Sequence, residues 1–316
     1  MSTLKDLRAW RKAIGGGAER VAVIGGTFHM LQPGNITAVR LAKRYAGHLC
    51  VILEPDCSSG AAKAHAAHGP NDRPAVSLSE RLEMVSHLKD VDLVTSCRPT
   101  LAKARLECLR PYTWVYCKKQ IDGKLAARAG ELADCRVSIP SIPGCFTPEI
   151  LAAIRKGRTP IHIPGLAPGK RPVPAHRSSG RILVTANGCF DVLHIGHLRF
   201  LSQARAMGDE LVVLINNDAS VRRYKGATRP IFPLKFRKTA LLALRSVSAV
   251  RSFHEDNPLR LIAQLEPNTH VKGGSYDPTR VDGERELLKR WGGSLAFCPM
   301  VKGRSTSAYL QKVTAP

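Results

Sequence analysis

Three kinds of pattern are missing from this sequence, and each absence excludes a class of protein. The chain has no run of roughly 18 consecutive apolar residues, so we expect no membrane span. Residues 1–15 lack the apolar core of a secretion signal. The nine cysteines include no Cys-x-x-Cys pair, and their spacing fits neither a zinc site nor a disulfide framework. Scattered thiols of this kind are typical of a reducing compartment, and we expect a cytoplasmic protein.

Acidic residues are scarce beside basic ones, since 25 Asp and Glu stand against 48 Lys and Arg, a formal net charge of +23. Such a charge suits nucleic-acid binding, and it equally suits the gathering of small polyanions such as NTPs and sugar phosphates. The basic residues are spread along the chain, without a long Lys/Arg block or an aromatic RNA-binding signature. Charge alone therefore does not decide the function, and the motifs argue against nucleic acid as the partner.

The length of 316 residues is enough for two domains. Residues 155–180 contain five prolines, six Lys or Arg and no acid, and they lack apolar periodicity, as in an extended linker. We therefore expect domains at 1–157 and 179–316, joined by a linker over 158–178. At the start of the chain, Leu4 and Leu7 belong to an apolar helical stripe that also contains Trp10 and Ile14. This stripe favours packing on the first domain, and a homodimer contact is the alternative.

The two halves resemble each other in order and spacing. Val21–Asn35 in the first half parallels Leu183–His197 in the second, and a helix-like stretch and an apolar strand follow each. Arg81 matches Arg237 at an offset of 156, and Leu109-Arg-Pro matches Leu265-Glu-Pro at the same offset. A colinear series of matches indicates duplication. Because short apolar strands alternate with helices, each half is expected to be an α/β, Rossmann-like, doubly wound parallel sheet.

The strongest functional pattern lies in the second half. A strand expected over Arg181–Ala186 runs into a tight turn, Asn187–Asp191, and His194-Ile-Gly-His197 then opens a helix. Residues three apart on a helix share a face, so both imidazoles are expected to point the same way. The helix amino terminus is a natural seat for phosphate, and ligands of open α/β sheets bind at the carboxyl ends of the strands. Two surface histidines at a helix start are the alternative interpretation.

Three downstream segments add basic or hydroxyl groups. They are Lys225-Gly226, which follow a strand ending Asn216-Asn217-Asp218, then Lys272-Gly273 after another strand, and Gly303-Arg-Ser-Thr-Ser307 before the last helix. Each of them, taken singly, could be a solvated loop or a helix cap.

Together these stretches resemble the His-x-Gly-His nucleotidyltransferases, over nearly all of the second half. Within that family the chain is most similar to the adenylyltransferase domains of ADP-heptose synthesis, and less so to glycerol-phosphate and ethanolamine-phosphate cytidylyltransferases. The segments that carry the resemblance are 187–197, 216–226, 229–234, 271–276 and 303–307.

The resemblance implies transfer of a nucleoside monophosphate, AMP from ATP, to a sugar phosphate, heptose 1-phosphate, with release of pyrophosphate. It implies catalytic roles for His194, His197 and Lys225. It implies Mg²⁺ bound to the NTP and held mostly by phosphate and water, with no metal site of the protein's own. The nucleotide contacts that it implies are Asn187, Gly188, Cys189, Phe190, Asp191, Gly196, Lys272, Gly273, Arg304, Ser305 and Thr306. The substrate contacts that it implies are Asp218, Arg229 and Arg237, for which structural loop and helix charges are the alternative.

Some positions depart from the family pattern and leave the acceptor and the base open. Ser275 stands where the family has Asp, Phe236 where an acid is common, and Asn257 where Thr is common. Transfer of CMP to glycerol phosphate or an alcohol phosphate is therefore an alternative, as is a nucleic-acid-binding protein without catalysis on this scaffold.

The first half has lost the histidine pair. Gln32 and Asn35 occupy the places of His194 and His197. Amide side chains can donate hydrogen bonds but cannot carry positive charge. We therefore predict that the first half is catalytically silent.

Overall fold

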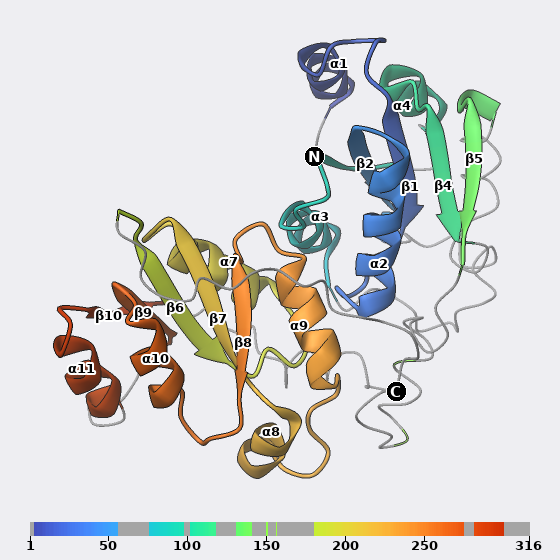
Figure 1. The fold of residues 1–316 in the computed structure, drawn as a ribbon. Helices are drawn as coiled ribbons and strands as arrows, with labels where there is room; N and C mark the ends of the chain where they lie inside the picture. Colours follow the sequence, from blue (N-terminus) through green and yellow to red (C-terminus); the bar gives the residue numbers. More distant parts are fainter. Residues whose placement is uncertain are drawn as a thin grey trace. The chain divides into compact units, whose positions relative to one another are not determined.

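The computed structural model of the chain describes residues 3–55, 76–97, 102–117, 131–140, 150, 156, 180–274 and 281–299. Contacts divide the chain into two compact units, Met1–Glu149 and Ile150–Ala315. Each unit is built on its own five-stranded sheet with helices beside it (Figure 1). The linker expected over 158–178 lies outside the described residues.

The N-terminal unit has a parallel sheet of order β3-β2-β1-β4-β5. The strands are β1 (Val21–Gly26), β2 (His48–Leu53), β3 (Leu93–Ser96), β4 (Thr113–Cys117) and β5 (Cys135–Ile139). The helices are α1 (Leu4–Ala13), α2 (Pro33–Ala42), the 3₁₀ turn η1 (Lys43–Tyr45), α3 (Leu78–Ser86) and α4 (Ala102–Leu109).

The C-terminal unit has a parallel sheet of order β10-β9-β6-β7-β8. The strands are β6 (Leu183–Gly188), β7 (Glu210–Asn216), β8 (Ala249–Phe253), β9 (Thr269–Gly273) and β10 (Ser294–Cys298). The helices are α7 (Ile195–Arg205), α8 (Asp218–Lys225), α9 (Leu234–Leu242), α10 (Leu259–Leu265) and α11 (Asp282–Lys289). This is the expected α/β fold, with parallel strands and helical crossovers in both units.

The two sheets have the same strand order, and their registers correspond. Val21 pairs with His48 in the N-terminal unit, and Leu183 pairs with Glu210 at the equivalent point of the C-terminal unit. The loops also correspond, because Arg110 and its equivalent Glu266 both have left-handed φ angles, 46° and 45°. The repeat inferred from sequence therefore extends to backbone conformation.

A buried arginine has the same role in each unit. Arg81 and Arg237, which the sequence aligned, are 0% and 1% exposed. Nη1 of Arg81 donates to the carbonyl of Thr27 at 2.5 Å, and Nη1 of Arg237 donates to the equivalent carbonyl of Cys189 at 2.7 Å. Each guanidinium thus fixes the turn that follows the first strand of its sheet.

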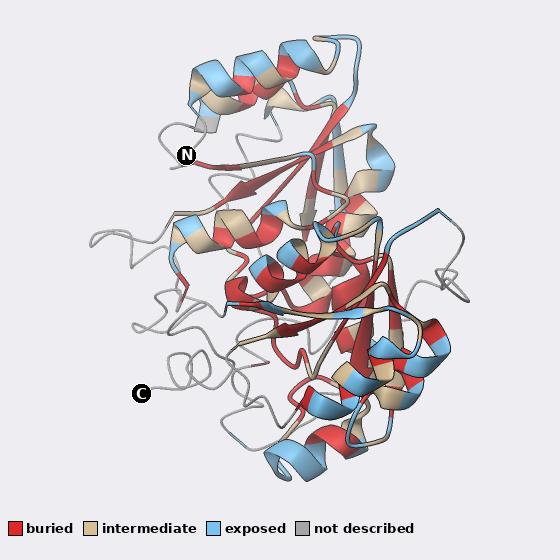
Figure 2. Cartoon of the chain, turned by 90° about the vertical axis from the view of Figure 1, so that its left-hand side faces the viewer, coloured by how far each residue is buried: buried red, intermediate tan, exposed pale blue. Residues whose placement is uncertain are grey.

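The central strands are buried on both faces, as apolar runs without polar alternation predict (Figure 2). In the N-terminal unit, Leu7 of α1 is fully buried in a core that includes Trp114, and the other apolar residues of the α1 stripe pack against that core. The expected docking of this helix on the first domain is confirmed.

No helix in the described ranges is long and apolar enough to cross a bilayer. Seven cysteines fall within these ranges, and none of the seven forms a disulfide.

Candidate active site

The two histidines of the His-x-Gly-His motif lie together where β6 gives way to α7. His194 is the N-cap of α7, with extended backbone angles, and His197 lies in the first turn of that helix. Their ring centroids are 3.7 Å apart and the ring planes are inclined by 30°. The expectation that both imidazoles share one helix face is therefore confirmed. Their place at the carboxyl end of the first strand is where open parallel sheets bind ligands.

The surroundings of His197 favour its neutral form. Burial lowers the pKa of His197 well below its ordinary value of 6.5, and the neighbouring His194 and Lys225 lower that pKa further. The residue as a whole is half-buried, and its Nδ1 is buried. At neutral pH this imidazole is a hydrogen-bond donor and acceptor without charge. Positive charge near the pair comes from Lys225, an exposed residue at the end of α8.

The turn before α7 requires a glycine because an aromatic ring folds over it. Phe190 has a left-handed φ of 46°. A Cβ placed on Gly188 would lie 2.9 Å from Cε2 of Phe190, closer than real contacts allow. The same ring lies 5.2 Å from the ring of His197, measured between centroids. Gly188 and Phe190 together set the backbone that faces the histidine pair.

Two carboxylates near the turn are engaged by the protein itself. Oδ2 of Asp191 accepts from Nη1 of Arg229 at 2.9 Å, and Oδ1 accepts from the backbone N–H groups of Ile231 and Phe232. Asp191 is 3% exposed. The residue therefore joins the turn to the segment before α9, and neither of its carboxylate oxygens is left to face a ligand.

Asp218 and Arg237 form a second internal link. Nη2 of Arg237 donates to Oδ1 of Asp218 at 2.7 Å, and the same oxygen accepts from the N–H of Leu234 at 2.8 Å. Nε of Arg237 donates to the carbonyl of Phe232 at 3.0 Å. These contacts favour the structural alternative for the pair, since the arginine uses its donors within the fold.

Lys272 and Gly273 lie within β9, where the sequence placed them after a strand. Nζ of Lys272 is in a short ion pair with Oε1 of Glu284, and both side chains are buried. The acid on α11 therefore neutralises much of the charge that Lys272 was expected to bring to the phosphates.

A polar residue that the motifs did not single out lies beneath the site. His270 is fully buried, with Nδ1 2.8 Å from Oγ1 of Thr185 and Nε2 3.3 Å from Oδ1 of Asn187. Since an amide oxygen can only accept, Nε2 carries the proton and Nδ1 accepts from the threonine hydroxyl. Burial, followed by the charge of Lys272, lowers the pKa of His270 from 6.5 to about 3. His270 thereby orients Asn187, one of the expected nucleotide contacts.

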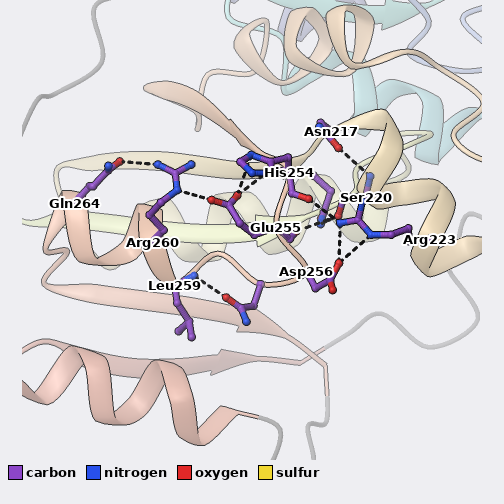
Figure 3. Close-up of polar contacts among 11 residues, drawn as sticks. Asn217, Ser220, Arg223, His254, Glu255, Asp256, Leu259, Arg260 and Gln264 are labelled. Carbon is purple, nitrogen blue, oxygen red and sulfur yellow. Dashed lines mark hydrogen bonds and ion pairs between the residues drawn. The ribbon is translucent and has the colours of Figure 1, made fainter.

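The helix that carries Lys225 is held by polar contacts to the loop after β8 (Figure 3). Oγ of Ser220 donates to the carbonyl of Glu255 at 3.2 Å. Nη2 of Arg223 donates to Oδ1 of Asp256 at 2.8 Å. The sequence analysis took Asn216-Asn217-Asp218 as the end of a strand. The last two positions were wrong, because β7 ends at Asn216 and Asn217 caps, through the N–H of Ser220, a helix that runs from Asp218 to Lys225.

A family model described as cytidylyltransferase-like matches residues 185–308, which begin in β6 and include every later element described here. The C-terminal unit carries a cytidylyltransferase-like domain. It is 48% identical over 141 residues to the bifunctional protein HldE of Geotalea uraniireducens, a match that covers 45% of this chain and 29% of the relative. HldE of Streptomyces coelicolor is 48% identical over 136 residues, covering 43% of this chain and 29% of the relative.

A solved structure gives a further likeness. The lipopolysaccharide core biosynthesis protein from Thermoplasma volcanium is 28% identical, with a TM-score of 0.33, over 39% of this chain and 98% of that protein. The chain spans less than a third of the length of the HldE relatives that it matches.

The structure places most expected site residues of the cytidylyltransferase-like domain at the carboxyl ends of its strands. The first strand differs from expectation, because Asn187 and Gly188 belong to β6 and pair with Leu214 and Ile215. Cys189 is half-buried near Asn216, and Gly196 is buried in α7. Arg304, Ser305 and Thr306 lie outside the described residues. His270 could have been found from sequence only as a histidine in a strand, a pattern that carries no functional signal alone.

Proposed function

We propose that the cytidylyltransferase-like domain transfers AMP from ATP to a sugar phosphate of the heptose 1-phosphate class and releases pyrophosphate. The observation that carries the proposal is the pair of adjacent imidazoles, His194 and His197, at the amino end of α7. Identity of 44–48% to proteins named HldE supports the same class of reaction. These relatives do not favour CMP transfer to an alcohol phosphate or a nucleic-acid-binding role.

The proposed reaction is an in-line displacement at the α-phosphorus. An oxygen of the acceptor phosphate forms the new bond, the bond from the α-phosphorus to the bridging oxygen breaks, and pyrophosphate leaves with that oxygen. His194 and His197 would donate hydrogen bonds to oxygens of the α- and β-phosphates as charge grows there. Lys225 would supply positive charge from the side of α8. This work is positioning and electrostatic stabilisation, with no covalent enzyme intermediate.

The lowered pKa of His197 suits this role. A neutral donor costs little to keep desolvated before substrate arrives, and the charge of a bound triphosphate would then raise the pKa of the ring. Gly188 and Phe190 would shape the surface that meets the nucleotide, because the turn brings backbone close to the histidines. The further contacts that we propose on the phosphates are Arg304, Ser305 and Thr306.

Mg²⁺ would enter with the triphosphate. The described residues contain no cluster of three or more His, Cys, Asp or Glu side chains that could hold a metal ion. Asp191, the acid nearest the turn, uses both carboxylate oxygens within the protein. These residues fit an ion held mainly by phosphate oxygens and water, which is the usual coordination of Mg²⁺ on nucleotides.

For the N-terminal unit we propose a fold without transfer activity. Gln32, in the place of His194, is fully buried, and its Oε1 accepts from the N–H of Gly34 at 2.5 Å as the cap of α2. The amide thus has a structural use at the point where the C-terminal unit has an imidazole.

The cellular location and the oligomeric state stay predictions. Cysteines that form no disulfide are typical of proteins in a reducing compartment, so we keep the prediction of a cytoplasmic location. We also keep the homodimer as a prediction.

The test is pyrophosphate release by the full chain, with each of the four NTPs offered against heptose, hexose, glycerol and amino-alcohol phosphates. ATP with a heptose phosphate should give the highest kcat/KM. Preference for CTP with glycerol phosphate would move the assignment to the alternative reaction. Absence of turnover with every pair, together with tight and steeply salt-dependent RNA binding, would overturn the enzyme assignment.

A double variant assigns the activity to one unit. In the full chain, His194→Ala with His197→Ala should reduce pyrophosphate release to background, because Gln32 and Asn35 cannot replace the imidazoles. Substantial turnover in the double variant would show that the N-terminal unit is active.

A further inference from the structure

A second concentration of positive charge lies in the N-terminal unit, far along the sequence from the histidine pair. A cavity of about 480 Å³ lies between α1 and α4, and we refer to it as the α1–α4 cavity. The charged residues of its lining are Arg8, Arg11, Lys12, Glu107 and Arg110. Four cations face one carboxylate, so the lining has a formal charge of +3.

The α1–α4 cavity lies at the amino ends of the strands, whereas active sites in this fold lie at the carboxyl ends. Gly16 and Gly17, which line it, precede β1, and Arg110 precedes β4. Figure 1 shows α1 and α4 beside the amino ends of these strands. The ligand site expected of a parallel sheet is at the carboxyl ends, where α2 begins. The α1–α4 cavity is therefore not the counterpart of the histidine site.

Arg11 gives the cavity an incompletely neutralised charge. Its side chain is 8% exposed, and Nη1 donates to the carbonyl of Glu19 at 2.7 Å. Within the described residues, Nε of Arg11 is buried without a hydrogen-bond partner. Burial lowers the pKa of Arg11 and the positive charge of Arg110 lowers it further, while the carboxylate of Glu19 opposes part of this lowering. A buried cation beside other cations is costly unless an anion approaches it.

Glu107, the one acid among the described lining residues, does little to neutralise this charge. Glu107 is exposed, and its Oε1 is 4.0 Å from Nζ of Lys103 on the same helix. A surface contact of that length contributes little, and it draws the carboxylate toward a further cation. The field in the cavity is therefore positive.

We propose that the α1–α4 cavity binds a small phosphorylated ligand, such as a sugar phosphate or pyrophosphate. Its volume is in the range of small-molecule sites. Arginine forks suit phosphate oxygens, and the backbone at Gly16 and Gly17 can approach a ligand without side chains between. Among the described residues, the lining contains no aromatic ring on which a base could stack, which disfavours single-stranded nucleic acid as the occupant.

The test is calorimetric titration of the full chain with inorganic pyrophosphate in the absence of metal. Arg8→Glu and Lys12→Glu change exposed residues of the cavity, and each should weaken one binding event about ten-fold or more. Lys5→Glu is the matched control, because Lys5 is exposed on the same helix but does not line the cavity, and its affinity should stay within about two-fold. The same event should persist in the His194→Ala, His197→Ala double variant.

Three results would overturn the site. Equal affinity for pyrophosphate in the cavity variants and in Lys5→Glu would show that pyrophosphate does not bind in the α1–α4 cavity. Loss of the event in the histidine double variant would place the anion in the C-terminal unit. Tighter binding of a single-stranded oligonucleotide, weakened by the same cavity variants, would make nucleic acid the occupant. Because the assay measures binding without turnover, its failure would leave the proposed transfer reaction untouched.

Discussion

His270 is expected to make the C-terminal unit sensitive to acid. The ring is fully buried between Thr185 and Asn187, and its pKa of about 3 lies below the ordinary value of 6.5. Between these two pH values the unfolded chain binds a proton at this histidine and the native chain does not. Stability from this group is therefore complete above pH 6.5 and is lost as the pH falls toward 3.

The size of the effect follows from the two pKa values. Lowering the pH from 7 to 5 should cost about 2 kcal/mol of the free energy of unfolding through His270 alone. The lowered pKa of His197 acts in the same direction, so a variant is needed to isolate one histidine. His270→Gln keeps a donor and an acceptor but cannot titrate. The stability difference between the parent and this variant should be smaller by about 2 kcal/mol at pH 5 than at pH 7.

The assay is urea denaturation followed through Trp291, the only tryptophan of the C-terminal unit. Its indole N–H donates to the carbonyl of Pro267 at 2.9 Å and its ring packs on the core of that unit, so its fluorescence reports unfolding there. Trp10→Phe and Trp114→Phe remove the other two tryptophans. The matched control is His254→Gln, which changes a 75% exposed histidine and should keep the pH dependence of the parent. A parent-to-variant difference that stays constant within about 0.5 kcal/mol from pH 7 to 5 would refute the reasoning.

Three further substitutions test the site and its support. Arg237→Gln should lower the free energy of unfolding by about 3–5 kcal/mol in urea denaturation, because it removes a buried guanidinium and leaves the half-buried carboxylate of Asp218 and two carbonyls without their donor. Gly188→Ala should weaken ATP binding measured by calorimetry, since the new Cβ would meet an aromatic ring at 2.9 Å; Gly26→Ala, the equivalent change in the N-terminal unit, should leave ATP binding unchanged. Lys225→Ala should lower kcat about 100-fold, whereas Arg222→Ala, an exposed cation on the same helix, should have little effect; equal losses would reduce the role of Lys225 to general surface charge.

Much of the fold could be predicted because it depends on local pattern. Apolar runs such as His48–Leu53 gave the strands, and the colinear matches between the halves gave the duplication. Arg81 and Arg237, which the sequence aligned, donate to equivalent carbonyls in the two units. The alignment of the halves in sequence therefore predicted a correspondence in structure. The spacing of His194 and His197 predicted that the two rings would lie together, and the cap and first turn of α7 bring them there.

The side-chain pairings could not be predicted in the same way. Lys272 looked like a phosphate ligand until the fold brought Glu284 of α11 against it, and sequence distance gives no sign of that contact. Asp191 looked available for a ligand, but both its oxygens are used by a segment about forty residues further along. His270 depends on a threonine and an asparagine in the adjacent strand, which only the register of β6 and β9 brings together. The chemistry of a single residue thus depended on tertiary contacts that motifs do not encode.

The most direct measurement for the histidine pair exchanges it for the equivalent side chains of the N-terminal unit. His194→Gln and His197→Asn, made singly in the full chain, reproduce Gln32 and Asn35 of the N-terminal unit and keep hydrogen-bonding groups. Pyrophosphate release with saturating ATP and heptose 1-phosphate should fall about 100- to 1000-fold in kcat for each variant, while the urea midpoint of the C-terminal unit stays close to that of the parent. A kcat within a few-fold of the parent in both variants would contradict the account.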